Sequence, residues 1–503
     1  MQPARNAAPS QAANHQRHQP ENTLLYQVIQ QHYPVFKATL EEQRQPLPHY
    51  IQQEFDDYLK CGRLEHGFLR VRCEECHHER LVAFSCKRRG FCPSCGARRM
   101  VESAALLVDK IFPQVRIRQW VLSFPFQLRF LLARDPKVMT AVLGIVYRAI
   151  STHLIKQAGF NKATARTGAV TLIQRFGSAL NLNVHFHMLF VDGVYADNSG
   201  KQRFQSVQAP SYADLHRLVH TLSHRIARYL ERQGLLERDS ENTWLTLEGG
   251  AEEIEQNTLN QLHGHSITYR IAAGPQQGRK VFTLQTLPSQ EDTAQVNDYV
   301  AKLNGFSLHA GVVAQAHQRD KLERLCRYVS RPSVAENRLA LTTNGQIRYE
   351  LKTPYRDGTT HVIFQPLDFI AKLAALIPKP RVNLTRFHGV FAPNSHHRAE
   401  ITPAGRSKKD TDQEHQQQDI HQRHQAMTWM QRLKRVFDID IQTCEHCGGH
   451  VKVIACIEDP VVIKQILEHL AKKNESKNQH QLPQERAPPE HNLFSPAQSR
   501  LFD

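Results

Sequence analysis

The stretch LNVHFHMLFVDGVY, residues 182–195, has the alternation of a β-strand with two different faces. One face is wholly apolar and carries Val184, Phe186, Met188 and Phe190. His185 and His187 lie on the other face, so both imidazoles project in the same direction and could chelate one divalent ion. A strand needs only one apolar face to join a core, which leaves the histidine face available for binding. A chance pair is the alternative, since the chain has 29 histidines.

Strands and helices alternate around this stretch. Further strands are predicted over 117–125, 168–177, 265–272 and 280–287. The 3.6-residue periodicity predicts helices over 23–60, 102–112, 126–134, 136–159, 211–234 and 461–470. The alternation over about 115–330 predicts one α/β sandwich domain.

Length, composition and charge restrict the class of protein. The 503 residues allow roughly two to four domains, and 40% hydrophobic and 22% charged residues are typical of a soluble globular chain. The sequence shows no secretory signal and no apolar run of the roughly 18–20 residues that span a membrane, so we expect a cytoplasmic protein without membrane contact. The net charge of +16 and the pI near 9.4 favour nucleic acid as a partner, although a basic surface can serve solubility alone.

Six of the ten cysteines lie in the segment 61–95. Two CxxC pairs in this segment, separated by 15 residues, are formed by Cys73, Cys76, Cys92 and Cys95. This spacing is typical of a zinc site in which two knuckles complete one tetrahedral shell. We expect the zinc to be structural, because four thiolates leave no open position. Cys61 and Cys86 could form a second site, replace one of the four ligands, or be small buried residues.

A third CxxC pair, Cys444 and Cys447, lies near the other end of the chain. The sequence indicates half a zinc ribbon, whose remaining ligands could be His450 and Cys456. The alternation of VKVIACI, residues 451–457, also allows Cys456 to be an ordinary strand residue.

The segment HQRDKLERLCRYVSRPSVAENRL, residues 317–339, predicts a helix that ends before Pro332. Its apolar stripe consists of Leu322, Leu325, Cys326 and Val329. Tyr328 lies off this stripe and shares its face with Lys321, Arg324 and Arg331. A tyrosine among cations could attack a DNA phosphodiester, whereas the alternative is an amphipathic tyrosine with its hydroxyl in solvent.

Two motifs together, HFHMLFVDGVY and YVSRPSVAENRL, resemble the rolling-circle insertion-sequence transposases of the HUH superfamily, and within these the single-tyrosine, common-region (ISCR-type) members. The six-cysteine segment is similar to the zinc-binding domain of that family. WVLSFPFQLRFLL resembles its first strand–helix block, and TCEHCGGHVKVIACIEDPVVIKQILEHL resembles its C-terminal segment. The likeness covers roughly 25–400 and 428–470.

The resemblance implies an α+β fold, an HUH-endonuclease-like sandwich around a central antiparallel sheet, with a small zinc-binding domain before it and a mixed region after it. It implies that His185 and His187 bind Mg²⁺ or Mn²⁺ and that a polar side chain from another element is the third ligand. Our candidate for this ligand is Gln174, on the neighbouring strand, or else Asp192. Tyr328 matches the nucleophile that nicks one strand and forms a 5′-phosphotyrosine. Related members have a second tyrosine where this chain has Arg324, which favours a single covalent attachment.

We also expect contacts with single-stranded DNA at the element ends. The segments 351–364 and 378–391 interleave basic and aromatic residues, although solvated loops would look similar. The candidate DNA-binding residues are Arg88, Arg89, Lys321, Arg324, Arg331, Lys352, Arg356 and Arg381. A bacterial, nucleoid-associated location and host replication factors as further partners follow from this expectation.

These features divide the chain into seven parts. We expect disorder over 1–22, a helical and zinc-binding domain that binds DNA over 23–101, a catalytic domain over 102–335, a basic and aromatic extension over 336–401, a linker over 402–427, a CxxC segment over 428–472 and a disordered tail over 473–503. Two alternative functions remain. A replication initiator or relaxase would use the same chemistry, although the helicase signature GxxxxGK[ST] is absent from the sequence. A non-catalytic zinc-dependent DNA-binding protein would need the cysteines but not His185, His187 or Tyr328.

Overall fold

The computed structural model describes residues 19–198, 201–238, 243–245, 257–289, 298–405 and 443–478. The expected disorder over 1–18, the linker from 406 onward and the tail beyond 478 lie outside these residues. Inside them, Pro20–Asn22 form a 3₁₀ turn, and the last helix continues past Lys472 to Asn478, so the described parts of both expected disordered segments contain regular structure.

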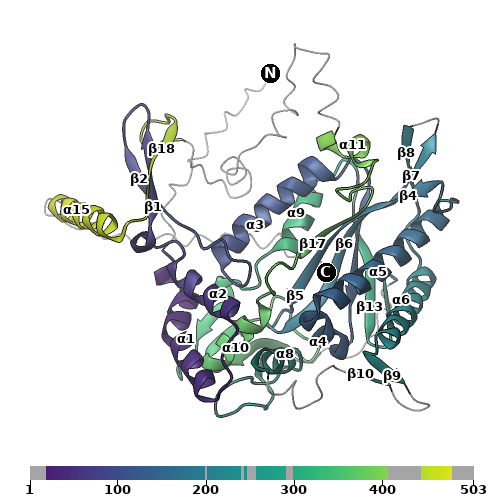
Figure 1. The fold of residues 1–503 in the computed structure, drawn as a ribbon, viewed down its shortest axis with the longest axis horizontal. Coiled ribbons are helices and arrows are strands. Elements are labelled where there is room, and N and C mark those ends of the chain that lie inside the picture. The colour runs from purple at the N-terminus through teal and green to yellow at the C-terminus, as the bar shows by residue number, and fades with distance from the viewer. Residues whose placement is uncertain are drawn as a thin grey trace, which may run out of the picture.

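A six-stranded antiparallel sheet forms the centre of the molecule (Figure 1). Its strands, in spatial order, are β12 (Val300–Leu303), β13 (Phe306–Ala314), β3 (Ile117–Ser123), β6 (Leu182–Val191), β5 (Gly168–Phe176) and β17 (Thr385–Gly389). β6 carries the histidine pair and lies between β3 and β5. β17 comes from the segment that we expected to be a separate extension, but it pairs with β5 and so belongs to the same sheet.

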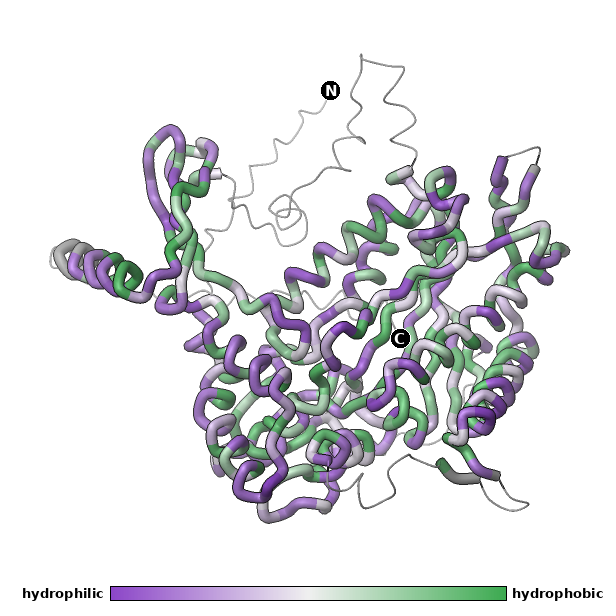
Figure 2. Tube along the Cα trace, in the orientation of Figure 1, coloured by the Kyte–Doolittle hydropathy of each residue, from purple (hydrophilic) through white to green (hydrophobic). Residues whose placement is uncertain are grey.

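Three helices cover the apolar face of β6: α4 (Phe126–Arg134), α5 (Pro136–Gln157) and α6 (Tyr212–Arg232). Asp135 caps α5, and Ser211 and Asp214 form a capping box that begins α6. Figure 2 shows hydrophilic residues on the side of α6 that faces away from the sheet. Of the helices that the structure describes, α5 alone is long and apolar enough to cross a membrane, and its apolar residues pack in this core.

The histidine face of β6 is covered as well, by α3 (Pro93–Leu106), a following π-helical turn (Leu107–Ile111) and α9 (Arg319–Ser330). Leu189 and Val191, which share the face of the histidines, pack with the apolar stripe of α9 and with α3. The face that we expected to be available is therefore buried beneath the helix that carries Tyr328.

A second core lies beside the sheet. It contains α1 (Leu24–Glu42), α2 (His49–Lys60), α8 (Thr258–Ile267), α10 (Pro366–Leu376) and a sheet in the order β11 (Phe282–Gln285), β16 (Thr359–Phe364), β15 (Ile347–Glu350) and β14 (Leu339–Leu341). The helix predicted over 23–60 is two helices, because Pro46 and Pro48 interrupt it. The strand predicted over 265–272 is wrong: Asn257 caps α8, which continues to Ile267.

A three-stranded sheet projects from the body and joins distant parts of the chain (Figure 1). β1 (Phe68–Cys73) pairs with β2 (Glu79–Ala83) on one side and with β18 (Val451–Ile457) on the other. We call these three strands the arm; α15 (Pro460–Asn478) follows β18. The C-terminal CxxC segment, expected as a separate region, thus completes the N-terminal zinc-binding region.

Smaller elements complete the described structure. They are β4 (Ala165–Arg166), β7 (Gly193–Asn198), β8 (Lys201–Ser206), β9 (Leu236–Arg238), β10 (Thr243–Leu245), α11 (Arg398–Ile401) and two 3₁₀ turns (Leu64–His66 and Glu336–Arg338). The strand predicted over 182–195 is divided at Asp192 into β6 and β7.

Candidate active site and metal centres

The two histidines lie side by side on β6, as the alternation predicted. Their ring centroids are 4.8 Å apart, and His185 and His187 are 9% and 6% exposed. Opposite His185, the register of the sheet places Gln174 on β5. The predicted third candidate thus lies next to the pair, and its side chain is buried as well.

Nε2 of His185 and Oε1 of Gln174 face each other, although both are hydrogen-bond acceptors. Nδ1 of His185 lies 2.8 Å from the backbone oxygen of Asn183, and because a carbonyl oxygen only accepts, Nδ1 carries the proton. Nε2 of the neutral ring then has a lone pair, yet it lies 2.9 Å from Oε1 of Gln174, another acceptor. The amide nitrogen of Gln174 donates to the backbone oxygen of Val329 at 3.3 Å, which is consistent with this orientation of the amide.

Protonation of Nε2 of His185 would turn it into a donor to Gln174, but the surroundings disfavour the charged imidazole. Burial lowers the pKa of His185 to about 4, with the positive charges of Arg331 and Arg129 adding to the effect against the opposing bond to Asn183. The imidazole is therefore neutral near pH 7. A metal ion between the two acceptors fits, because ligands about 2.1 Å from an octahedral ion and at right angles are about 3.0 Å apart.

His187 offers a further unsatisfied atom. Its Nε2 is buried and has no hydrogen-bond partner among the described residues. Burial lowers the pKa of His187 well below its usual value, and His185 and Arg331 lower it further. The other nitrogen, Nδ1, lies 2.7 Å from the side-chain amide of Gln119 on β3. Gln119 was missed at the sequence level: alternation places it on one face of the strand over 117–125, but only the pairing of β3 with β6 shows that this is the histidine face.

Tyr328 lies half-buried on α9, which ends at Ser330 as predicted, before Pro332. All four residues of the predicted apolar stripe are buried. Two cations contact the phenol ring: Cζ of Arg331 is 4.2 Å and Nζ of Lys352 is 4.6 Å from its centroid. In such cation–π contacts the positive charge is attracted by the electron-rich face of the ring.

The tyrosine helix is joined directly to the histidine pair. Val329, the residue after Tyr328, accepts the hydrogen bond from Gln174, whose other amide atom faces His185. Arg331 also lies over Phe176 on β5, 5.4 Å from the ring centroid. Segments that are far apart in the sequence thus meet at one place.

Asp192, the alternative third ligand, has a different role. It is fully buried and pairs with Arg116 at 2.7 Å and with Arg118 at 2.8 Å. It also follows the far end of β6, five residues or roughly 16 Å along an extended chain from His187. The structure therefore contradicts Asp192 as a ligand.

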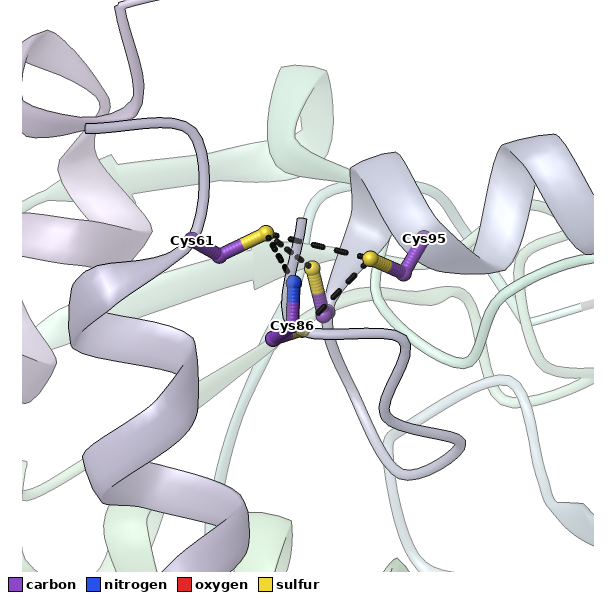
Figure 3. Close-up of side chains that lie close together, drawn as sticks. Cys61, Cys86 and Cys95 are labelled. Atoms are coloured by element: carbon purple, nitrogen blue, oxygen red, sulfur yellow. Dashed lines mark hydrogen bonds between the residues drawn. The ribbon is translucent and has the colours of Figure 1, made fainter. Parts of the chain in front are cut away.

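The cysteines form two tetrads, and the predicted grouping is wrong. The first, which we call the body tetrad, consists of Cys61, Cys86, Cys92 and Cys95. Figure 3 shows Cys61, Cys86 and Cys95 pointing toward one another. Sγ of Cys61 is 3.8 Å from Sγ of both Cys92 and Cys95, and the Cys86–Cys95 distance is 3.5 Å. Sulfurs at about 2.3 Å from a tetrahedral zinc are about 3.8 Å apart, so the geometry fits.

The second, which we call the arm tetrad, consists of Cys73, Cys76, Cys444 and Cys447. Its Cys73–Cys447 and Cys76–Cys444 sulfur distances are both 3.4 Å. In both knuckles the residue after the second cysteine has a positive φ, 56° at His77 and 76° at Gly448, as a tight turn around an ion requires.

The physical reason for the regrouping is the length of the β1–β2 hairpin. Cys73 and Cys76 lie at its tip, roughly 17 Å from its base, where the body tetrad is found. His450 and Cys456, the ligands proposed to complete the C-terminal knuckle, are exposed instead. Nδ1 of His450 lies 3.7 Å from a carboxylate oxygen of Glu74, and Cys456 donates to Glu458 at 3.5 Å.

The candidate DNA-binding residues divide into two groups. Arg88 pairs with Asp57, and Arg89 donates to the backbone oxygen of Val382 at 3.1 Å, so both hold the fold together. The residues with exposed side chains are Arg324, Lys352, Arg356 and Arg381, whereas Lys321 and Arg331 are half-buried.

Comparisons with known proteins give two family matches for this chain. Residues 168–400, which contain the histidine pair and Tyr328, match the family model described as "Putative transposase". Residues 28–124, which contain the body tetrad and half of the arm tetrad, match the transposase zinc-binding domain of IS91-type elements. No curated protein and no solved structure matches the chain. The chain therefore carries a transposase domain and a transposase zinc-binding domain, and it has two cysteine tetrads that suit structural zinc. These domains imply a DNA-binding enzyme that cleaves and transfers strands.

Proposed function

We propose that the protein is the transposase of a rolling-circle insertion sequence, and that Tyr328 nicks single-stranded DNA at the element ends beside a divalent ion. The observation that carries the proposal is that two acceptors, Nε2 of His185 and Oε1 of Gln174, face each other at 2.9 Å, while the buried Nε2 of the adjacent His187 has no hydrogen-bond partner among the described residues.

Three side-chain atoms would hold the ion: Nε2 of His185, Nε2 of His187 and Oε1 of Gln174. Mg²⁺ or Mn²⁺ bound there would act as a Lewis acid on the scissile phosphate. Gln119 would orient His187 by accepting the proton of Nδ1 through its amide oxygen, a half-turn of the amide that keeps the 2.7 Å contact and leaves Nε2 free to coordinate.

The chemistry is a transesterification. The phenolic oxygen of Tyr328 attacks phosphorus and loses its proton, the bond from phosphorus to the 3′-oxygen breaks, and that oxygen takes up a proton as a 3′-hydroxyl. The product is a 5′-phosphotyrosine, and rejoining is the reverse reaction, so neither step consumes ATP. Arg331 and Lys352, which contact the phenol ring, are placed to attract the phosphate.

A single covalent attachment follows from the residue that stands where related members have a second tyrosine. Arg324, one turn before Tyr328 on α9, is exposed and cannot act as a nucleophile. Together with Lys321, Lys352, Arg356 and Arg381 it would bind the phosphates of the unpaired strand.

The test uses the full chain with single-stranded oligonucleotides that span the ends of the element, plus Mg²⁺ or Mn²⁺. We expect a protein–DNA adduct that survives denaturation, that disappears in Tyr328→Phe and that is strongly reduced in His187→Ala. The matched control is Tyr33→Phe in α1, which removes another phenol hydroxyl, one that donates to the backbone oxygen of Gln52 at 3.4 Å, and should still form the adduct. DNA binding without any adduct would instead support a non-catalytic zinc-dependent DNA-binding protein.

A further inference from the structure

The helix that carries Tyr328 lies between the central sheet and α3, and α3 begins at the body tetrad. Cys92 is the N-cap residue of α3 and Cys95 lies in its first turn. Figure 1 shows α3 and α9 side by side, and Ala104, Leu107 and Val108 pack with the apolar stripe of α9. The position of α9 thus depends on an element that starts at two metal ligands.

The first turn of α9 is attached to the far end of this element. The guanidinium of Arg319 donates to the backbone oxygens of Phe112 at 3.0 Å and Pro113 at 3.2 Å, and also to that of Val108. These carbonyls lie in and just after the π-helical turn that continues α3. The anchor fixes the beginning of α9 along α3.

The end of α9 is attached to the zinc knuckle itself. A Cβ atom added at Gly96 would lie 2.7 Å from Cβ of Pro332, so α3 and the turn after Tyr328 are as close as a glycine permits. The hydroxyl of Ser333 donates to the backbone oxygen of Gly90 at 3.3 Å. Gly90 and Gly96 flank the ligands Cys92 and Cys95, which places the knuckle directly against the turn at 331–333.

We propose that the body tetrad, with zinc bound, positions Tyr328 over the histidine pair, in addition to stabilising the fold. Both ends of α9 are held by the zinc-anchored helix, while its middle reaches the site through the bond from Gln174 to Val329. Gly96, Pro332 and Ser333 are then positioning residues for the nucleophile. The consequence for DNA cleavage rests on the proposed function; the consequence for the order of α9 does not.

The key variant is Gly96→Ala in the full chain. Alanine is a better helix former than glycine, so the substitution should not destabilise α3 itself. The new methyl group must, however, displace Pro332. We expect unchanged zinc content and unchanged affinity for the oligonucleotide. We expect faster amide exchange over 319–333, and an adduct rate at least about tenfold lower, because a misplacement of about 1 Å can cost about 100-fold. The decrease should appear in kcat rather than KM.

Two further variants make the result specific. Gly264→Ala in α8 adds the same methyl group where nothing lies within 4 Å, and it should behave as the wild type. The double variant Gly96→Ala with Pro332→Gly removes the atom that the methyl group meets, and should recover both the exchange protection and the adduct rate.

Normal exchange over 319–333 in Gly96→Ala would overturn the inference, and so would a wild-type adduct rate. The two proposals fail separately. If the wild-type chain forms no adduct, the proposed function fails, while the exchange measurement still decides whether the knuckle orders α9.

Discussion

The body tetrad and the arm tetrad have the same four ligand types in different surroundings. Three of the four body cysteines are buried, and all four come from a segment of 35 residues, Cys61 to Cys95. Two of the four arm cysteines are exposed, and its halves lie 368 and 374 positions apart in their paired contacts. The body tetrad therefore belongs to a core, whereas the arm tetrad closes a small sheet from two ends of the chain.

The largest expected difference between the tetrads is in global stability. Cys92→Ser removes a ligand that is 4% exposed and that begins α3, so we expect a loss of about 4 kcal/mol or more in the free energy of unfolding, measured by urea denaturation. Cys447→Ser, in the exposed arm, is the matched variant and should leave the unfolding of the body within about 1 kcal/mol of the wild type. Equal decreases in the free energy of unfolding would show that the two tetrads stabilise the body to the same extent.

The second difference is in local stability. We expect the purified chain to hold two zinc ions and Cys444→Ser to hold one, measured by native mass spectrometry. Since β18 pairs only with β1 among the described strands, its loss from the sheet should expose the segment after 443 to protease. A protease-resistant Cys444→Ser chain would mean that the strand pairing suffices without the metal.

The third difference is in the pH dependence of stability, because the body contains a buried histidine, His263. His263 on α8 is 1% exposed, neither ring nitrogen has a hydrogen-bond partner among the described residues, and burial, with Arg175 and Lys379, holds its pKa well below the usual value. Below about pH 6.5 the imidazole of His263 binds a proton in the unfolded chain but stays neutral in the folded chain. The stability that the neutral, buried His263 contributes is therefore complete above that pH and is lost as the pH falls.

The slope should reach up to about 1.4 kcal/mol per pH unit below about pH 6.5, measured by urea unfolding between about pH 7.5 and 5.5. His263→Leu should reduce the pH dependence of the free energy of unfolding by the same amount. Identical slopes in the variant and the wild type would assign the acid sensitivity to other groups.

The smallest effect is expected at the ion pair between the two halves of the arm. Arg80 on β2 lies 3.1 Å from Glu445 in the C-terminal knuckle, and both side chains are partly exposed. A double-mutant cycle of Arg80→Ala and Glu445→Ala, followed by amide exchange in β18, should give a coupling of about 0.2–1 kcal/mol. A larger coupling energy would mean that this ion pair, rather than the metal and the strand hydrogen bonds, holds the two halves of the arm together.

Local patterns predicted the two central elements of the candidate site well. Alternation in 182–195 placed both histidines on one face, and the periodicity of 317–339 placed Tyr328 off the buried stripe. Gln174 was a correct neighbour of His185, whereas Gln119 was missed and Asp192 was wrong. Gln119 was missed because only the pairing of β3 with β6 shows which face it shares, whereas Asp192 fails because it lies five residues along the chain from His187 and pairs with Arg116 and Arg118.

The sequence by itself determined the strand with its histidine pair, the tyrosine helix and the presence of cysteine knuckles, because each depends on residues within a few positions of one another. Only the tertiary structure decided that α9 covers the histidines, that Cys61 and Cys86 complete the site of Cys92 and Cys95, and that Cys444 and Cys447 belong with Cys73 and Cys76. Spacing within a CxxC pair is set by the bond geometry of one turn. For Cys73 and Cys76 the partner pair is set by sheet pairing across hundreds of residues, which no local pattern records.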